Sequence, residues 1–401
     1  MRDTILILLI TLLLGEALTR WALGIEPLAL ESIIWEDHPR WGWAHRPHAE
    51  ETFAKLGCRQ RIRSNARGLR EREIPHERTP GLLRILAVGD SGLVGFEVAA
   101  EDVFTRVAER ALLDAGHRVE FVNAGCRGYG TDQALLFLED EGLAYRPDVV
   151  LYWFGPNDPD DNRTVHRPYR RFGKGYFDLD ADGELVLHGT PVPQFPYRRG
   201  LLVDEHGALQ PLELSAASHA RLWARDNLIC RSSVLTAAAY VAAALPSLAG
   251  RLRGAGSVRL EEPGGPERGS RLFRVTAAMV ARMRTLAEEQ GAQFFMIGAR
   301  MPWTVALREE LTLIELGDWQ RFRARLPPNA KIHVPYDTHW NELGHRVYGE
   351  ALAAALIESR ALADLRDGAA VSESRDSAAS DLRRSPAGRR ASGSGPGSSS
   401  G

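Results

Sequence analysis

The chain has 401 residues, which is enough for one large domain or two modest ones. It is 44% hydrophobic and 25% charged, so it can bury the core of a globular protein. A formal net charge of −2 argues against a nucleic-acid-binding protein. The three cysteines show no CxxC spacing, which argues against a zinc site, and we expect no metal and no cofactor.

An apolar segment opens the chain. Residues Ile5–Leu14 are aliphatic except for Thr11, and Arg2 and Arg20 flank them. This length matches the core of a signal peptide and is short for a full membrane span. We expect residues 1–25 to be a membrane anchor or a signal peptide, and we favour the retained anchor. Either would place the folded part on the extracytoplasmic side, in the periplasm or at the cell surface, or secrete it after cleavage.

Two patterns follow this segment. Residues 26–80 contain tryptophans and prolines but few long apolar runs, so we expect an N-terminal extension of short strands and turns. From residue 81, apolar runs typical of buried strands alternate with helical periodicity. The expected strands are 83–88, 119–123 and 148–154, and the expected helices are 104–115 and 132–143. This alternation predicts an α/β fold, a three-layer α/β/α parallel sheet with helices on both sides.

The alternation stops at residues 159–270, which we expect to be an inserted subdomain over the face that carries the candidate site. It contains an expected hairpin over 177–187 with its turn at Asp182-Gly183, a helical region over 215–245 and a flexible linker over 250–269. The sheet domain, 81–365, resumes with helix 272–290, strand 293–298, a short strand 331–334 and a helix 342–359 capped by Asn341. Residues 366–401, rich in serine, glycine and arginine, are expected to be disordered.

Polar motifs stand where the expected strands end. They are Gly89-Asp90-Ser91, Asn123-Ala124-Gly125-Cys126-Arg127-Gly128, Gly155-Pro156-Asn157-Asp158 and Asp337-Thr338-His339. Open α/β sheets place their sites at the carboxyl ends of their strands, so we expect these motifs to meet. A serine on a strand-end turn, with a histidine and a nearby carboxylate, indicates acyl transfer or ester hydrolysis. We expect Asp90 to hold its turn by a side-chain to backbone hydrogen bond, and Trp153 and Trp340 to pack in the core.

This order of motifs resembles the SGNH hydrolases, also called the GDSL esterase/lipase family, over roughly residues 83–158 and 292–358. The resemblance implies a flavodoxin-like α/β/α fold and an esterase that needs no cofactor. It implies that Ser91 is the nucleophile and His339 the general base, while Asp337 orients the imidazole.

The resemblance also implies an oxyanion hole. Its donors would be the backbone N–H groups of Ser91 and Gly128 and the side-chain amide of Asn157, with Gly125 as the second candidate for the glycine. A glycine suits that place because the backbone must approach the substrate closely.

The chain departs from the family pattern at two places. Gly92 follows the serine where the family usually has leucine, and only Thr338 separates Asp337 from His339, where the family usually has two residues. The shorter spacing is similar to that in the SGNH-like domains of alginate O-acetylation proteins, which are exported and move acetyl groups onto polysaccharide. The segment 64–70 also resembles one that precedes the first motif in membrane-anchored members, and we expect it to brace the edge of the sheet.

Three functions remain open at this point. The first is a membrane-anchored serine esterase acting on small or carbohydrate-linked acyl esters. The second is a polysaccharide O-acetyltransferase that passes the acyl group from Ser91 to a glycan hydroxyl. The third is a non-catalytic glycan- or partner-binding module. The expected partners are an acyl-ester substrate, a glycan and a membrane but no nucleic acid, and the oligomeric state is left open.

Overall fold

A four-stranded parallel sheet lies at the centre of the protein. The structure is a computed structural model, and it describes residues 2–23, 33–55, 57–244, 266–298, 301–313, 316, 324–335 and 337–359. The strand order is β13-β7-β5-β6, with bounds β5 (Leu83–Gly89), β6 (Val119–Gly125), β7 (Val149–Phe154) and β13 (Gln293–Gly298). This order confirms the predicted flavodoxin-like parallel sheet. Its point of reversal lies beside β5, where such sheets open a crevice for ligands.

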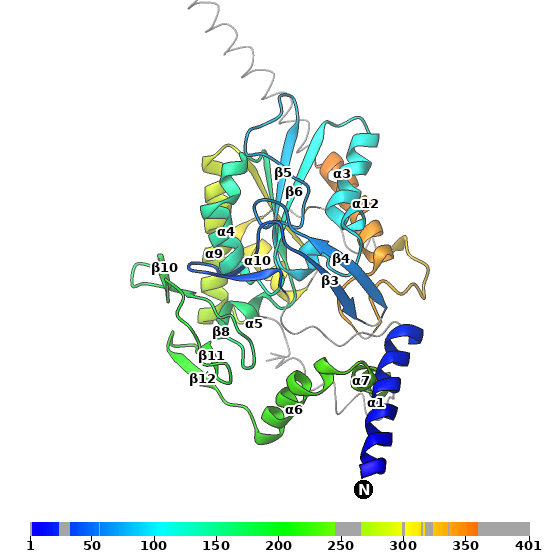
Figure 1. Cartoon of the computed structure of the whole chain (residues 1–401). Helices are drawn as coiled ribbons and strands as arrows, with labels where there is room; N and C mark the ends of the chain where they lie inside the picture. The colour runs from blue at the N-terminus through cyan, green and yellow to red at the C-terminus, as the bar shows by residue number, and fades with distance from the viewer. Residues whose placement is uncertain are drawn as a thin grey trace, which may run out of the picture.

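Helices cover both faces of this sheet. Figure 1 shows α4 (Thr131–Asp140) and α9 (Arg271–Glu289) on one side, and α3 (Phe104–Asp114) and α12 (Glu342–Glu358) on the other. Every residue of β5 is buried, and its side chains alternate between the two layers. Leu86 and Val88 pack with the α4–α9 layer, whereas Ile85 and Ala87 pack with the α3–α12 layer. A strand covered on both faces reads as a continuous apolar run, and this run made the sheet predictable.

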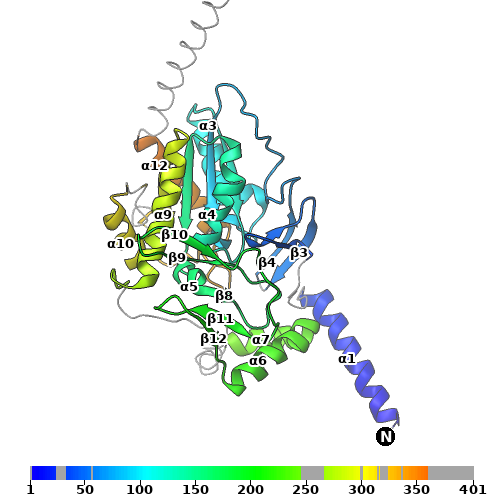
Figure 2. The same ribbon diagram turned by 90° about the vertical axis from the view of Figure 1, so that its left-hand side faces the viewer.

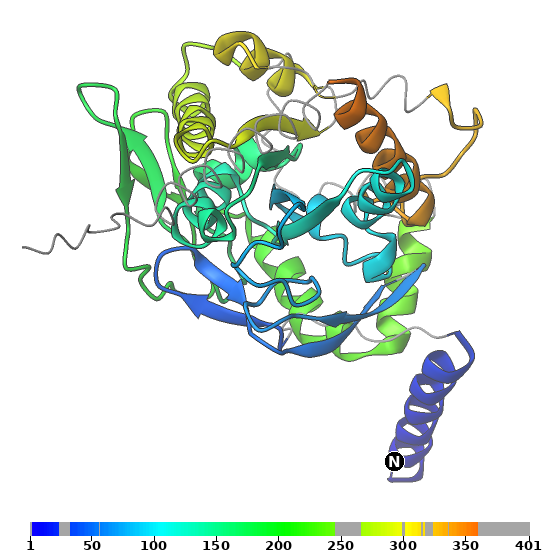
Figure 3. The same cartoon turned by 90° about the horizontal axis from the view of Figure 1, so that it is seen from above.

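The N-terminal extension forms two antiparallel hairpins, as expected of short strands and turns. They are β1 (Trp35–His38) with β2 (Gly42–His45), and β3 (Glu50–Lys55) with β4 (Cys58–Arg63). Ile34 and Ile62 of this region pack against Val94 and Phe96, directly after β5. Figure 3 shows these blue hairpins along one side of the sheet domain.

The described part of the inserted residues carries small sheets, three α-helices and a short 3-10 helix. The elements are α5 (Asp158–Arg163), β8 (Thr164–His166), β9 (Tyr176–Leu179), β10 (Leu185–His188), β11 (Gly200–Val203), β12 (Leu209–Leu212), α6 (Ala216–Asn227), η3 (Ile229–Arg231) and α7 (Ser233–Ala244). The predicted hairpin is confirmed: β9 pairs with β10, and Gly183 adopts a φ of 84° in the connecting turn. Residues 245–265, which hold most of the expected linker, and the expected tail 366–401 lie outside the described residues.

The apolar N-terminal segment is one helix, α1 (Arg2–Leu23), which projects from the body in Figure 2. Its span Asp3–Ala22 is long and apolar enough to cross a membrane, and a signal sequence would have the same character. The final turns of α1 meet α7. The backbone N–H of Ser233 donates to Glu16 at 2.8 Å, and Arg20 donates to the Ser233 hydroxyl at 2.9 Å.

The last predicted strand is wrong. Within the described residues, 331–334 form only an isolated bridge, between His333 and Trp340, and do not join the central sheet. Pro328 and Pro335 flank this stretch, and proline cannot donate to a ladder. The remaining helices are short: α2 (Ser91–Val94), η1 (Ala100–Asp102), η2 (Gly142–Tyr145) and α10 (Pro302–Leu311). Asn341 caps α12 as predicted, because its side chain accepts from the Gly344 N–H.

Candidate active site

Ser91 stands at the end of β5 and begins the single turn α2. The chain turns closely here: a Cβ at Gly89 would lie 2.8 Å from the Cβ of Trp153, so only glycine fits. Asp90 accepts a hydrogen bond from the Gly92 N–H at 2.8 Å, which confirms the expected turn-holding bond. Burial raises the pKa of the Asp90 carboxyl. The turn is thus held from its own residues, and the serine hydroxyl lies at the carboxyl edge of the sheet.

The structure brings the last motif to this serine. The Ser91 Oγ lies 2.8 Å from the Nε2 of His339, a residue 248 positions away. The Nδ1 of the same ring lies 2.5 Å from the Oδ1 of Asp337, and the His339 backbone N–H donates to that oxygen at 2.8 Å. The loop that carries them is tied back by a bond from the Val334 N–H to the His339 carbonyl at 3.0 Å. One residue between Asp337 and His339 is therefore enough to place both side chains in one hydrogen-bonded series with Ser91.

The ionised form of the Asp337 carboxyl is strongly favoured over the protonated form. Burial alone would raise the pKa of this carboxyl, but the hydrogen bond and charge of His339, together with the Lys55 ammonium, lower it far below the usual range. The Lys55 Nζ donates to the Oδ2 of Asp337, the oxygen that does not face the imidazole. Asp337 therefore remains an acceptor for the imidazole N–H throughout the range in which histidine ordinarily titrates.

The sequence analysis missed a second carboxylate beside the imidazole. The Glu97 side chain is fully buried, and its Oε1 lies 3.6 Å from the Nδ1 of His339. Lys55 and Arg127 both donate to this Oε1, at 2.6 and 2.9 Å. Burial raises the pKa of Glu97, but the charges of Arg127, His339 and Lys55 outweigh it and lower the pKa to about 2. The sequence did hold a signal for this carboxylate, since Glu97 is an isolated acid within the apolar stretch 93–98. An acid in such a stretch is buried only when it has a charged or hydrogen-bonding partner, so it indicates a partner elsewhere in the chain.

Donor atoms of Glu97, Asp337 and His339 lie within 4.8 Å of one another, which would suit a metal ion. The Lys55 ammonium already bonds to both of these carboxylates. A divalent cation would have to displace this buried ammonium, so the donor set fits the lysine better than a metal.

The two glycines proposed for the oxyanion hole differ. The Gly125 N–H donates to the side chain of Asn123 at 2.9 Å, so it is occupied. Gly128 has a φ of 79°, a conformation that favours glycine, and its N–H makes no hydrogen bond within the described part of the chain. Of the two, only Gly128 has a backbone donor available for a ligand.

Asn157 is held by carboxylates. Its amide donates to Asp161 at 2.7 Å, and its proximity to Asp90 opposes the rise in the pKa of that carboxyl. Burial raises the pKa of Asp161 to about 6, although Arg167 and Asn157 oppose this effect. To reach a substrate oxygen, the amide would have to turn one N–H away from this cluster.

The segment 64–70 closes the far end of the serine turn. Asn65 accepts from the N–H groups of Arg67 and Leu69, at 2.9 Å each, and so shapes the loop. Arg70 then donates to the carbonyls at the end of α2 and after it. These are Val94 at 2.9 Å, Gly95, and Val98 at 2.6 Å. A buried guanidinium thus bonds to a carbonyl at the end of a one-turn helix, Val94, and to two carbonyls of the loop that follows it.

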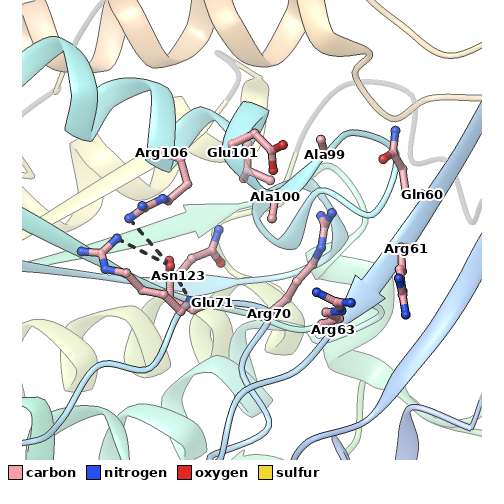
Figure 4. A pocket seen from close by; sticks show the side chains of 12 residues that line it. Gln60, Arg61, Arg63, Arg70, Glu71, Ala99, Ala100, Glu101, Arg106 and Asn123 are labelled. Atoms are coloured by element: carbon pink, nitrogen blue, oxygen red, sulfur yellow. Dashed lines mark hydrogen bonds and ion pairs between the residues drawn. The ribbon is translucent and has the colours of Figure 1, made fainter.

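A pocket of about 520 Å³ lies beside Arg70, and Figure 4 shows the residues that line it. Ser91, Asp337 and His339 are not part of this lining. Two of its arginines have acidic partners in the lining or beside it: Arg72 and Arg106 lie 3.1 and 2.9 Å from Glu109 and 3.8 Å from Glu71. The pocket is therefore separate from the triad, and its charges are largely paired.

Comparisons with known proteins identify the family of the chain. A model of the GDSL-like Lipase/Acylhydrolase family matches residues 87–347. No curated protein matches the chain. The solved structures it resembles include a protein of Desulfitobacterium hafniense described as lipolytic and of the G-D-S-L family, with 11% identity, a TM-score of 0.34, and coverage of 68% of this chain and 99% of that one.

Two further structures are similar to the chain. They are the lipase/acylhydrolase of Enterococcus faecalis, with 12% identity, coverage of 68% and 95%, and a TM-score of 0.33, and a family 3 carbohydrate esterase of Clostridium thermocellum, with 13% identity, coverage of 71% and 98%, and a TM-score of 0.31. The family model spans more than half of the chain and runs from β5 into α12, so this protein belongs to the GDSL-like lipase/acylhydrolase family.

Proposed function

We propose that this chain is a serine esterase in which Ser91 attacks the ester, His339 is the general base and Asp337 orients the imidazole. One observation carries the proposal: the hydroxyl, the imidazole and the carboxylate form a continuous hydrogen-bonded series, with steps of 2.8 and 2.5 Å. A nucleophile bonded to a base that is itself oriented by a third group is the arrangement that activates serine.

The reaction follows from these contacts. The Nε2 of His339 takes the hydroxyl proton as the Ser91 Oγ bonds to the carbonyl carbon. The resulting tetrahedral intermediate carries a negative oxygen, and the imidazolium is stabilised by Asp337. When the bond to the alkoxide breaks, His339 returns the proton to that oxygen and the acyl group remains on the serine. Water then repeats the sequence and releases the carboxylic acid.

The negative oxygen needs donors, and we assign them to the N–H groups of Ser91 and Gly128 and to the Asn157 amide. The unoccupied N–H of Gly128 supports its assignment. Asn157 would join after releasing one of its carboxylate partners. Each such donor typically contributes roughly 10²–10³ in rate.

The substrate is proposed to be a small or carbohydrate-linked acyl ester at a membrane. The exposed apolar helix α1 supports a retained anchor. We place the catalytic domain on the extracytoplasmic side as part of this proposal. The alternative function, a polysaccharide O-acetyltransferase, would use the same three residues. It would differ only in the acceptor of the acyl group, which would be a glycan hydroxyl in place of water.

The test compares the full chain in detergent with Ser91→Ala on an acetyl-ester chromogen. We expect activity to fall at least about 10³-fold, because no other group replaces the attacking oxygen. Fluorophosphonate labelling should be lost as well. Ser215→Ala, which removes the hydroxyl of an exposed serine at the start of α6, should retain both the hydrolysis of the chromogen and the fluorophosphonate labelling.

The outcomes separate the three functions. Full activity in Ser91→Ala would refute the esterase with this nucleophile. Product that appears only as acylated oligosaccharide, when an oligosaccharide is added, would show transfer in place of hydrolysis. A wild-type chain that binds glycan, but neither turns over esters nor reacts with fluorophosphonate, would be the binding module.

A further inference from the structure

One side chain of the N-terminal extension reaches the triad. Lys55 ends β3, before the residues that the family model matches, and its side chain is 13% exposed. Its ammonium bonds to both Asp337 and Glu97. Arg127 donates to the same Glu97 oxygen and stands one residue before Gly128. One set of charges therefore joins the extension, the loop after α2, the loop after β6 and the last motif.

These charges balance around the imidazole. Two carboxylates, Glu97 and Asp337, and two cations, Lys55 and Arg127, surround the Nδ1 side of His339. The four charges sum to zero while the imidazole is neutral. Each of them favours or disfavours protonation of the imidazole according to its sign. A carboxylate favours the imidazolium that forms during catalysis, and an ammonium disfavours it.

Two other titratable groups influence the same imidazole. Asp90 caps α2, and its buried carboxyl has a raised pKa. His345 lies on α12, and burial lowers its pKa to about 3, so it stays neutral where esterases work. The variants below leave both in place. Because the charge of Glu97 raises the pKa of His345 against the effect of burial, Glu97→Gln lowers that pKa further and His345 stays neutral.

We propose that Lys55 and Glu97 are positioning residues of the triad: they hold Asp337 against His339 and set the protonation of the imidazole from opposite directions. The inference rests on the proposed esterase function and deepens it. It makes the N-terminal extension part of the catalytic unit. The unused oxygen of Glu97 fits this role, because its Oε2 is buried with no hydrogen-bond partner among the described residues. A carboxylate retained under those conditions is poorly explained by packing alone.

The test is the pH dependence of kcat/KM in Lys55→Met, Glu97→Gln and the double variant. Losing the ammonium leaves two carboxylates facing one cation, so the acid limb should move up by about one pH unit. Losing the carboxylate leaves two cations facing Asp337, so the limb should move down by about one unit. The double variant should return close to the wild-type midpoint. Because neither side chain is placed to touch substrate, kcat should fall more than KM changes.

Two controls separate this role from simple bracing. Lys55→Arg keeps the charge and should restore the wild-type midpoint. Arg271→Met breaks a comparably buried pair with Asp178, between α9 and β9, and should lower stability without moving the profile. If Lys55→Met does not fold, Glu97→Gln and Lys55→Arg still test the proposal, because the acid limb should move down in the first variant and stay in place in the second. Single variants that lose stability with an unmoved acid limb would overturn the proposal.

A second readout does not depend on the reaction. The titration midpoint of the His339 imidazole, followed by NMR and assigned with His339→Gln, should shift in the same two directions. An active Ser91→Ala would refute the proposed function, and the NMR shifts would still decide the charge balance. If Ser91→Ala is inactive and the midpoints of both single variants coincide with wild type, only the present inference fails.

Discussion

Gly92, where the family usually has leucine, is predicted to accept no larger side chain. A Cβ at this position would lie 2.8 Å from the Nε1 of Trp153 and 3.0 Å from its Cε2. The indole cannot move aside, because it packs against Phe104 and Trp340 at 5.3 Å between ring centroids and against Tyr348 at 5.4 Å. Gly92→Ala should therefore overpack the turn that carries Ser91.

The expected cost is that of a methyl group forced into a filled core, about 1–3 kcal/mol. At about 2 kcal/mol, Tm would fall by roughly 4–8 °C for a domain of this size. Esterase activity and fluorophosphonate labelling should fall further than stability, because the displaced residue is next to the nucleophile. Differential scanning calorimetry and the chromogenic assay measure the two effects.

Two companion variants make this test specific. Trp153→Phe removes the indole nitrogen that a Cβ would meet, so the double variant should recover a large part of the loss beyond additivity. Gly269→Ala is the control, since its Cβ would meet no described atom within 4 Å. A Gly92→Ala chain with wild-type Tm and activity would refute the reasoning.

Two further predictions concern the pocket beside the serine turn. Burial raises the pKa of Glu71 to about 7 from an ordinary 4.5, so its ionisation costs stability as pH rises through this range, by up to about 3 kcal/mol. Glu71→Gln should therefore raise Tm at pH 8 and change it little at pH 4.5, and equal shifts at both would contradict this. Arg70→Met leaves the Val94, Gly95 and Val98 carbonyls without their donor, so unfolding free energy should fall by about 3 kcal/mol or more and Ser91 labelling should slow. Arg70→Lys should recover part of both, and unchanged urea denaturation of Arg70→Met would count against this clamp.

The elements that the sequence predicted are those specified locally. Strand β7 is a short apolar run, and β5 is one apart from Arg84; glycine or proline bounds both, and Asn341 caps its helix with its own side chain. The contact between Ser91 and His339 was predictable because both residues sit in short motifs that follow an expected strand or precede an expected helix. Local signals fix where each motif stands, and the parallel sheet brings them to one edge.

What the sequence did not reveal depends on contacts between distant segments. Lys55 and Asp337 are 282 residues apart, and no spacing rule links a hairpin lysine to the last motif. The amide of Asn157 was assigned to a substrate oxygen, but its partner Asp161 is known only once α5 is folded. The expected strand at 331–334 failed for a different reason. The segment Lys331–Val334 alternates polar and apolar residues like a half-buried strand, but within the described residues it pairs only at the bridge between His333 and Trp340.

The contact between α1 and α7 bears on which esters the enzyme can reach. Glu16 and Arg20 both form hydrogen bonds with Ser233, more than 200 residues away in the sequence. The helix α1 is therefore joined to the globular body by these contacts as well as by the chain that follows it. With α1 embedded in a bilayer, the body would have little freedom to swing or rotate above the lipid. The candidate active site would then reach only substrates within a thin layer next to the lipid headgroups. A polymer attached farther from the membrane would have to fold back toward the surface to be deacylated.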